Sequence, residues 1–337
     1  MQSNNFAFKK IVLAVSGIAL AGMMSVSHAA VEGLKLLDSI GTYKGELKTY
    51  YATKPTSAEL TERNKLAVTL ARASGISLQQ DKPLRLNETR TAFNSAADPS
   101  ASFEVDSVTG NFLFNGGLLK YRKEVSTPNL PQDIDSARLA SELLRKYGLT
   151  VDATQMKIAH IGGLNMSIAD GASGKSEIFE KLKTVRFSRN IGGLPVEGDG
   201  RIVVHLGEAG ALAGLVYQWP KLEKAVSLGS TALEKPATIR TRALREIEAK
   251  SGKALRAELT RADLVLYDDG KGVVEPAYHF VVKRYFDDGE LEPVMIPYDF
   301  YVPATLKPQA FYPHMEVAAV APKDGRAETT EPGTGNE

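Results

Sequence analysis

Residues 184–222 constrain the fold more than any other part of the chain, because apolar and polar side chains alternate there between clusters of glycine. Alternation with a period of two is typical of β-strands that bury one face. Apolar side chains recur in this way in three runs: Val185 and Phe187; Ile202, Val204 and Leu206; and Leu215, Tyr217 and Trp219. The Gly-Asp-Gly sequence at 198–200 favours a hairpin turn between the first two runs, and glycines at 207 and 210 bracket the next turn. The sequence predicts a three-stranded meander whose apolar face another element must cover.

This meander resembles the propeptide, called the FTP module, of thermolysin-like and fungalysin-like metalloproteases. The resemblance rests on the Gly-Leu-Pro-Val sequence at 193–196, the small residue Gly198, the valine-rich strand that follows and the turn at Gly210. In that family a PepSY-type module, made of one helix and then strands, comes next.

The matching segments here are a helix candidate at 236–251 and strands similar to PepSY strands at 264–284 and 294–304. The resemblance spans residues 182–304 and implies the two propeptide modules without the protease domain.

Two helices and several strands are predicted before the meander. Thr56 and Glu59 form a capping-box pattern at the start of the first helix. Its predicted apolar side consists of Leu60, Leu66, Leu70 and Ala73. A second helix is predicted over residues 133–147, with Asp133 or Asp135 as its N-cap. Strand-like alternation occurs at residues 84–93, 101–106, 112–114 and 156–161.

One helix and two hairpins are predicted after the meander, beyond a linker or crossover at 221–235. Residues 236–251 place Ile239, Ala243, Leu244 and Ile247 on one face of a helix, with Arg240, Arg242 and Arg245 on a solvated face. The Asp-Asp-Gly sequences at 268–270 and 287–289 favour hairpin turns between strands.

Together these elements predict an α+β protein, in which antiparallel sheets each pack against helices in two related or adjacent α+β layers. The predicted divisions are a signal peptide (1–29), an N-terminal helical segment (30–78), an FTP-like α+β domain (79–222), a PepSY-like α+β domain (223–312) and a disordered tail (313–337). The tail combines proline, glycine and charge without apolar periodicity.

The first 29 residues are typical of a secretory signal peptide, since Lys9 and Lys10 precede a short apolar run and Ser27-His28-Ala29 offers a cleavage site. This predicts a periplasmic or secreted protein with no integral membrane segment in the mature chain. The chain has no cysteine, which excludes disulfides and thiol chemistry. With 41 basic and 40 acidic side chains, the near-neutral charge argues against a nucleic-acid partner.

No catalytic motif and no cofactor is predicted. None of the five histidines is followed by glutamate, so the His-Glu-x-x-His zinc motif of the resembling proteases is missing. A zinc site from His160, His205 and His279 would require the fold to gather them. The acidic pairs Asp268-Asp269 and Asp287-Asp288 lack the spacing of calcium ligands and are predicted to be turn residues. We therefore expect a protein that is not an enzyme.

Aromatic side chains gather near the end of the second half, where they predict either core packing or a binding face. The candidate contact residues are Tyr298, Phe300, Tyr301, Phe311 and Tyr312. Because the propeptides of the resembling family inhibit and help to fold their proteases, the resemblance implies an exported, non-catalytic binder of another polypeptide, with a metallopeptidase as the candidate partner. The alternative is a periplasmic structural or small-ligand-binding module without a protease partner.

Overall fold

The computed structural model describes residues 30–118, 121, 128–149, 151–169, 176–287, 289 and 292–312. The predicted signal peptide at 1–29 and the predicted tail at 313–337 lie outside these residues. Within the described part of the chain, no helix has the length and apolar character needed to span a membrane.

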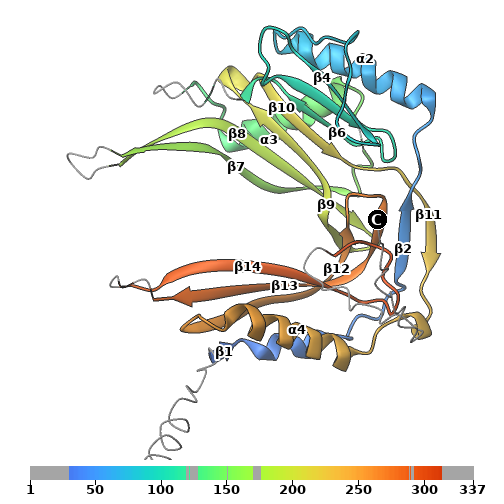
Figure 1. Ribbon diagram of the computed structural model, residues 1–337, viewed down its shortest axis with the longest axis vertical. Coiled ribbons are helices and arrows are strands. Elements are labelled where there is room, and N and C mark those ends of the chain that lie inside the picture. The colour runs from blue at the N-terminus through green and yellow to red at the C-terminus, as the bar shows by residue number, and fades with distance from the viewer. Residues whose placement is uncertain are drawn as a thin grey trace, which may run out of the picture.

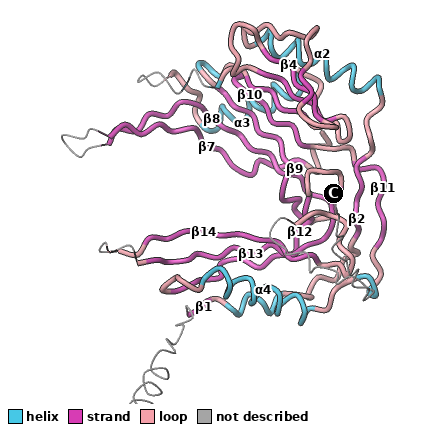
Figure 2. Tube along the Cα trace, in the orientation of Figure 1, coloured by secondary structure: helices cyan, strands magenta, loops and turns pink. Residues whose placement is uncertain are grey.

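A single connected sheet of 14 strands dominates the structure (Figures 1 and 2). Its main path runs β11-β2-β13-β12-β9-β10-β6-β5-β4-β3, while β14 pairs with β13, β1 with β12, β8 with β9, and β7 with β8. The α+β class is confirmed, but the expectation of separate antiparallel sheets is wrong. The sheet is continuous and mixed, because both β1 and β9 pair with β12 in parallel.

The first lobe, as we call it, contains two helices and eight strands. The helices are α2 (Ser57–Ala73) and α3 (Asp133–Lys146), and the strands are β3 (Leu84–Arg85), β4 (Arg90–Asn94), β5 (Ser102–Asp106), β6 (Phe112–Asn115), β7 (Met156–Ala169), β8 (Ser176–Ile191), β9 (Leu194–Leu206) and β10 (Leu212–Gln218), with the short 3-10 helix η3 (Glu208–Gly210) before β10. Both helices pack on the apolar face of the predicted meander. Its core includes Leu70, Phe103, Phe114, Leu144, Phe187 and Leu215.

The second lobe is built from the two ends of the described chain. It consists of β1 (Ala30–Glu32), the 3-10 helix η1 (Leu34–Ser39), α4 (Pro236–Ser251), β12 (Arg256–Asp268), β13 (Val273–Phe286) and β14 (Val294–Pro303). Leu37 and Ile40 pack with Ile247 of α4 and Phe280 of β13 in one core. Figure 1 shows α2 and α4 at opposite outer ends of the molecule, with the strands of both lobes between them.

Two further strands run along one side of the molecule and connect the lobes. These are β2 (Lys48–Ala52) and β11 (Leu222–Ser227), and η4 (Ser230–Ala232) follows β11. The two strands pair with each other, and β2 also pairs with the start of β13. Part of the predicted linker or crossover at 221–235 is therefore the strand β11.

The predicted turn at residues 198–200 is wrong, because the hairpin lies at Gly192-Gly193, where Ile191 pairs with Leu194. Both of these glycines have positive φ, at +59° and +87°. Residues 197–200 instead form a bulge in β9, since Ser188 pairs with Arg201 whereas Arg189 pairs with Val196. The bulge directs this part of β9 away from β8 and toward β12.

The capping box of α2 is confirmed, because Thr56 Oγ1 accepts from Glu59 N at 3.2 Å and Glu59 Oε2 accepts from Thr56 N at 2.7 Å. Ala73, however, is exposed, and Ala67 and Ala71 take its place in the core.

The N-cap predicted for α3 is wrong. Its N-cap is Gln132, which makes no side-chain cap hydrogen bond, so Asp133 and Asp135 lie within the first turn of the helix. There their negative charge still interacts favourably with the positive end of the helix dipole.

The boundaries of α4 agree with the prediction, but Arg240 is not simply solvated. Its guanidinium donates to Leu37 O at 3.0 Å and to Ile40 O at 3.2 Å. These carbonyls lie at the end of η1, where Leu37 O also accepts from Ile40 N at 3.2 Å. Arg240 thus ties η1 to α4.

Candidate functional site

The two lobes meet where three residues of β9 pair in parallel with β12. Val196 faces Leu266, Glu197 faces Tyr267 and Gly198 faces Asp268. Gly198 has φ +88°, and a Cβ at this position would lie 2.3 Å from Asp268 O. Only glycine permits this approach, because other residues would add both strain and a backbone clash.

A cluster of charged side chains lies directly beside this junction and is centred on His279 of β13. His279 is only 7% exposed. Its Nδ1 lies 2.6 Å from Glu197 Oε2, and its Nε2 lies 3.3 Å from Asp299 Oδ2. Arg261 Nη1 is also 3.0 Å from Nδ1. A ring nitrogen that carries a proton and donates it to a carboxylate has no lone pair left to accept a hydrogen bond from Arg261. We therefore assign the Nδ1 proton to the bond with Glu197.

Arg261 completes the cluster by bridging two carboxylates, with Nη2 at 2.8 Å from Glu197 Oε1 and Nε at 2.7 Å from Asp263 Oδ2. Burial raises the pKa of Glu197, but the hydrogen bond and charge of His279, together with Arg261, outweigh burial and leave that pKa below its ordinary value of 4.5. Glu197 is therefore an ionised group that holds β9, β12 and β13 together.

Replacing Glu197 with glutamine is expected to lower the free energy of unfolding at pH 7 by about 2 kcal/mol, because His279 and Arg261 lose their shared partner. The loss is smaller than for a fully buried ion pair, since Arg261 is partly solvated. Since the folded-state pKa of Glu197 is lowered, its stabilisation is present above pH 4.5 and is lost as the pH falls further. Urea unfolding should therefore separate the variant from wild type at pH 7 and much less at pH 3.5. Glu88→Gln, at an exposed position, is the control.

A stack of aromatic rings extends from the charged cluster. Tyr301 lies on His279 with ring centroids 4.4 Å apart, and its hydroxyl donates to Glu197 at 3.3 Å. Tyr267 contacts Tyr301 at 4.6 Å and Tyr312 at 4.7 Å. The stack connects the junction with the segment that follows β14.

Two carboxylates fix that segment through its backbone. Glu275 accepts hydrogen bonds from Gln309 N at 3.1 Å, Ala310 N at 3.2 Å and the Tyr312 hydroxyl at 3.0 Å. Asp269 accepts from Phe311 N at 3.1 Å. Glu275 has no exposed surface, and burial raises its pKa against the effect of these donors.

The predicted contact residues lie in different environments. Phe300 and Tyr312 are 2% and 6% exposed, so they are core residues. Tyr298 and Tyr301 are half-buried, and the Tyr298 hydroxyl donates to Glu246 of α4. Phe311 is 52% exposed, with the Lys271 ammonium 4.1 Å from its ring centroid. Of the five, Phe311 is the one available at the surface.

The predicted metal candidates are not brought together. His160, His205 and His279 lie on β7, β9 and β13, and His205 Nδ1 is bonded to the Thr184 hydroxyl at 3.1 Å. Among the described residues, no group of three or more histidine, aspartate or glutamate side chains could hold a metal ion. Asp268, Asp269 and Asp287 accept from backbone N–H groups in their turns, as predicted, while Asp288 lies outside the described residues.

Five residues of the site were not predicted from the sequence: Glu197, Arg261, Asp263, Asp299 and Glu275. One signal was available for Glu275, which is the charged residue in the otherwise apolar run at 273–277. The other four come from three strands far apart in the sequence, and no local pattern marks them.

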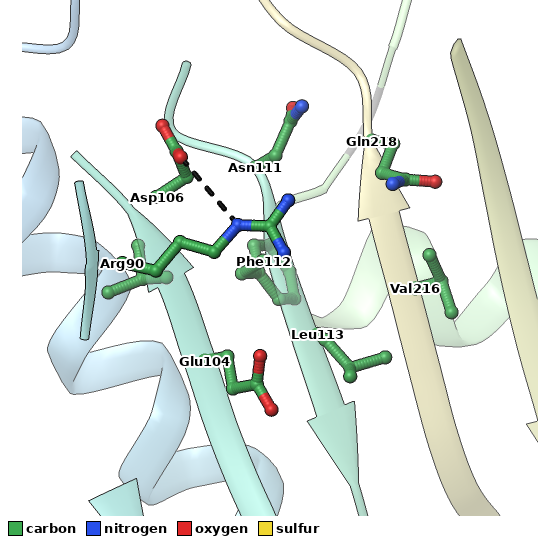
Figure 3. A pocket seen from close by; sticks show the side chains of 9 residues that line it. Arg90, Glu104, Asp106, Asn111, Phe112, Leu113, Val216 and Gln218 are labelled. Atoms are coloured by element: carbon green, nitrogen blue, oxygen red, sulfur yellow. Dashed lines mark ion pairs between the residues drawn. The ribbon is translucent and has the colours of Figure 1, made fainter. Parts of the chain in front are cut away.

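A small cavity of about 130 Å³ lies elsewhere, over β4, β5, β6 and β10 of the first lobe. Figure 3 shows Arg90 reaching toward Asp106 beside Phe112, with Arg90 Nε 3.9 Å from Asp106 Oδ2. Asn111 Oδ1 and Gln218 Oε1 line the cavity region and have no hydrogen-bond partner among the described residues. A cavity of this size suits a few water molecules rather than a substrate.

No family model matches the chain. No curated protein matches it either. Among solved structures, the chain is similar to an uncharacterized protein from Eubacterium rectale, with a TM-score of 0.43, 9% identity and coverage of 78% of this chain and 84% of that one. It is also similar to the Bacillus megaterium YpeB C-terminal domain, with a TM-score of 0.34, 8% identity and coverage of 75% and 95%. Similarity at this level assigns neither family nor function.

Proposed function

We propose that this protein is exported and binds another polypeptide, without catalysis, by adding a strand of that partner to the free edge of β14. The observation that carries the proposal is that β14, ten residues long, pairs only with β13 within the described chain. An unpaired edge presents backbone N–H and C=O groups that an extended peptide satisfies.

The start of β14 adds apolar contact area to this edge. Val294, Met295 and Ile296 are 42%, 45% and 44% exposed, although successive side chains point to opposite faces of the strand. Both faces are solvated here because the β13–β14 hairpin protrudes from the lobe (Figure 1). A partner segment paired with this end would cover apolar side chains on both sides of the sheet.

The long strand β7 also pairs on one side only, with β8. Its exposed apolar side chains, Ile158 and Leu164, are separated by the glycine pair at 162–163, which offers a partner no side chains to pack against. The free edge of β14 is therefore the better docking site. Phe311, in the segment that follows β14, provides a further exposed aromatic contact.

The class of partner follows from the resemblance to protease propeptides. The predicted signal peptide supports an encounter in the periplasm or outside the cell, and a metallopeptidase of that compartment is the partner we propose. The protein would then inhibit this peptidase or assist its folding.

The double substitution Val294→Asp and Ile296→Asp is expected to weaken this binding strongly, because it adds charge to the docking edge. The matched control, Ile158→Asp with Leu164→Asp, places equal charge on β7. Purified wild-type protein and the control should capture an envelope peptidase and inhibit its activity, whereas the β14 variant should be about tenfold or more weaker. Capture of no peptidase, with unchanged secreted proteolysis after gene deletion, contradicts the proposal.

A further inference from the structure

Two aspartates cross the junction between the lobes in opposite directions. Asp268 of β12 lies against β9 of the first lobe, because a Cβ at Gly200 would lie 2.8 Å from Asp268 Oδ2. Asp199 of β9 lies against the turn that follows β12, because a Cβ at Gly270 would clash with Asp199 Oδ2. Each lobe therefore places a carboxylate over a glycine of the other lobe. We call Asp199 and Asp268 the crossed aspartates.

No basic side chain pairs with the crossed aspartates. Among the described residues, no salt bridge includes Asp199 or Asp268. Asp268 is 3% exposed, and within the described chain one hydrogen bond reaches its carboxyl group, from Gly270 N at 2.9 Å. Two like charges from different lobes thus meet at a buried contact, where water screens their repulsion poorly.

The other titratable groups that face Asp268 come from β8, from β12 and from the turn after β12. Arg189 of β8 favours the ionised form of Asp268, but its guanidinium donates to Pro220 O at 2.9 Å and forms no ion pair with a described carboxylate. Asp269 adds a third carboxylate. Burial raises the pKa of the Tyr267 hydroxyl to about 12, so this neighbour stays neutral near pH 7. Three carboxylates therefore face one guanidinium.

The protonation of Asp268 is linked to the contact between the lobes. Burial, assisted by Asp269 and Asp199, raises the pKa of Asp268 to about 7 while the lobes are in contact. Separation would return this carboxyl group to water and its pKa toward 3.8. Between these values the closed junction keeps a proton that the open one releases, so each pH unit favours separation about tenfold. Above about pH 7 both forms are ionised and the effect levels off.

The two lobes can separate here without unfolding, because each has its own core. One core packs under α2 and α3, and the other packs under α4. Between them lie the three paired residues of β9 and β12 and a small apolar cluster of Val196, Leu266 and Val274. The bonds of Glu197 with His279 and Arg261 also cross the junction and oppose separation. The strands β2 and β11 would keep the separated lobes connected.

We propose that the contact between the lobes is controlled by a proton: the lobes stay together while Asp268 is protonated, and they separate between β9 and β12 when both crossed aspartates are ionised. The protein would thus change shape between mildly acidic and neutral surroundings. This inference is independent of strand addition at β14, which uses other residues.

The test is a distance measurement between the lobes at several pH values. Because the chain has no cysteine, spin labels can be attached selectively at Lys65→Cys on α2 and Glu248→Cys on α4, both exposed positions. Pulsed electron paramagnetic resonance on the chain without its predicted signal peptide should show one distance population at pH 5 and a second one at pH 8. The ratio of the second to the first should rise about 100-fold between pH 5 and pH 7 and then level off.

Substitutions assign this change to the crossed aspartates. Asp268→Asn has no proton to release, so it should keep the pH 5 distribution at every pH. Asp199→Asn removes the facing charge and should reduce the second population at pH 8. Asp38→Asn, at an exposed position on η1, is the control and should behave as wild type.

Gly198→Ala weakens the same strand pairing, so it should enlarge the second population at each pH and make a small open fraction measurable. Circular dichroism checks that each labelled variant is folded. Distance distributions that stay the same from pH 5 to pH 8 in both wild type and Gly198→Ala overturn the inference. An equal pH dependence in Asp268→Asn and wild type also overturns it, because another group such as His279 would then be responsible.

Discussion

Replacing Gly198 with alanine is expected to lower the free energy of unfolding by about 3 kcal/mol and to loosen the contact between the two lobes. The new methyl group would lie 2.3 Å from Asp268 O, which belongs to the backbone of β12 and cannot rotate away. Residue 198 also has φ +88°, a conformation that alanine adopts only with strain. Relief of the clash requires the three paired residues of β9 and β12 to separate.

A control in the turn between β8 and β9 separates the strain of a positive φ from the steric clash. Gly193 has nearly the same φ, +87°, but no atom lies within 4 Å of the position its Cβ would take. Gly193→Ala should therefore show the conformational penalty alone, about 1 kcal/mol. Urea unfolding followed by fluorescence of Trp219, the sole tryptophan, measures both variants. Equal destabilisation by the two substitutions would show that the close approach at Gly198 contributes nothing.

The second large effect is expected at Asp268, whose substitution by asparagine should stabilise the protein at pH 8. Asp268 is 3% exposed and forms no ion pair with the described residues. Burial raises its pKa from 3.8 to about 7, assisted by the nearby charges of Asp269 and Asp199 and opposed by the hydrogen bond from Gly270 N. A raised pKa means that the folded protein binds this proton more tightly than the unfolded chain does.

The sign of the pH dependence follows from this difference. Between pH 3.8 and about 7 the folded state keeps the proton that the unfolded state has released, so this group makes stability fall as the pH rises. A difference of about three pH units corresponds to about 4 kcal/mol, which is an upper limit for the gain in Asp268→Asn. Asparagine can still accept from Gly270 N through its carbonyl oxygen.

Thermal unfolding from pH 4.5 to pH 8 measures this effect. The melting temperature of Asp268→Asn should exceed that of wild type at pH 8, and the two should converge toward pH 4.5. Asp38→Asn, at an exposed position on η1, should follow the wild-type profile. Identical pH profiles for Asp268→Asn and wild type would mean that the Asp268 carboxyl is not desolvated by the fold.

Features encoded within a few neighbouring residues could be predicted from the sequence. The capping box at Thr56, the limits of α4 and the turn at 268–270 depend on local hydrogen bonds and backbone preferences. The period of two in the meander likewise identified the buried side chains Phe187, Val204 and Leu215.

Features that depend on partners distant in the sequence could not be predicted in this way. Two glycine clusters, at 192–193 and 198–200, both favour a turn, and the pairing of Gly198 with Asp268 decides which one becomes a bulge. The strand β2 is recognisable only beside β11, about 170 residues later. The exposure of the predicted aromatic residues was equally undetermined, since Phe300 is buried by contact with Phe280 and Phe311 is not.

The second lobe draws its parts from both ends of the described chain, and this bears on how the protein is made. β1 pairs with Arg256–Glu258, while Leu37 and Ile40 fill a core that also needs α4, β13 and β14. During synthesis, β1 and η1 must therefore remain without their core partners until α4, β13 and β14 have been made. Contacts of such long sequence separation slow folding. A fragment beginning at residue 223 would expose the apolar surface that η1 covers, so this lobe can close only when both the η1 segment and the segments from α4 to β14 are present.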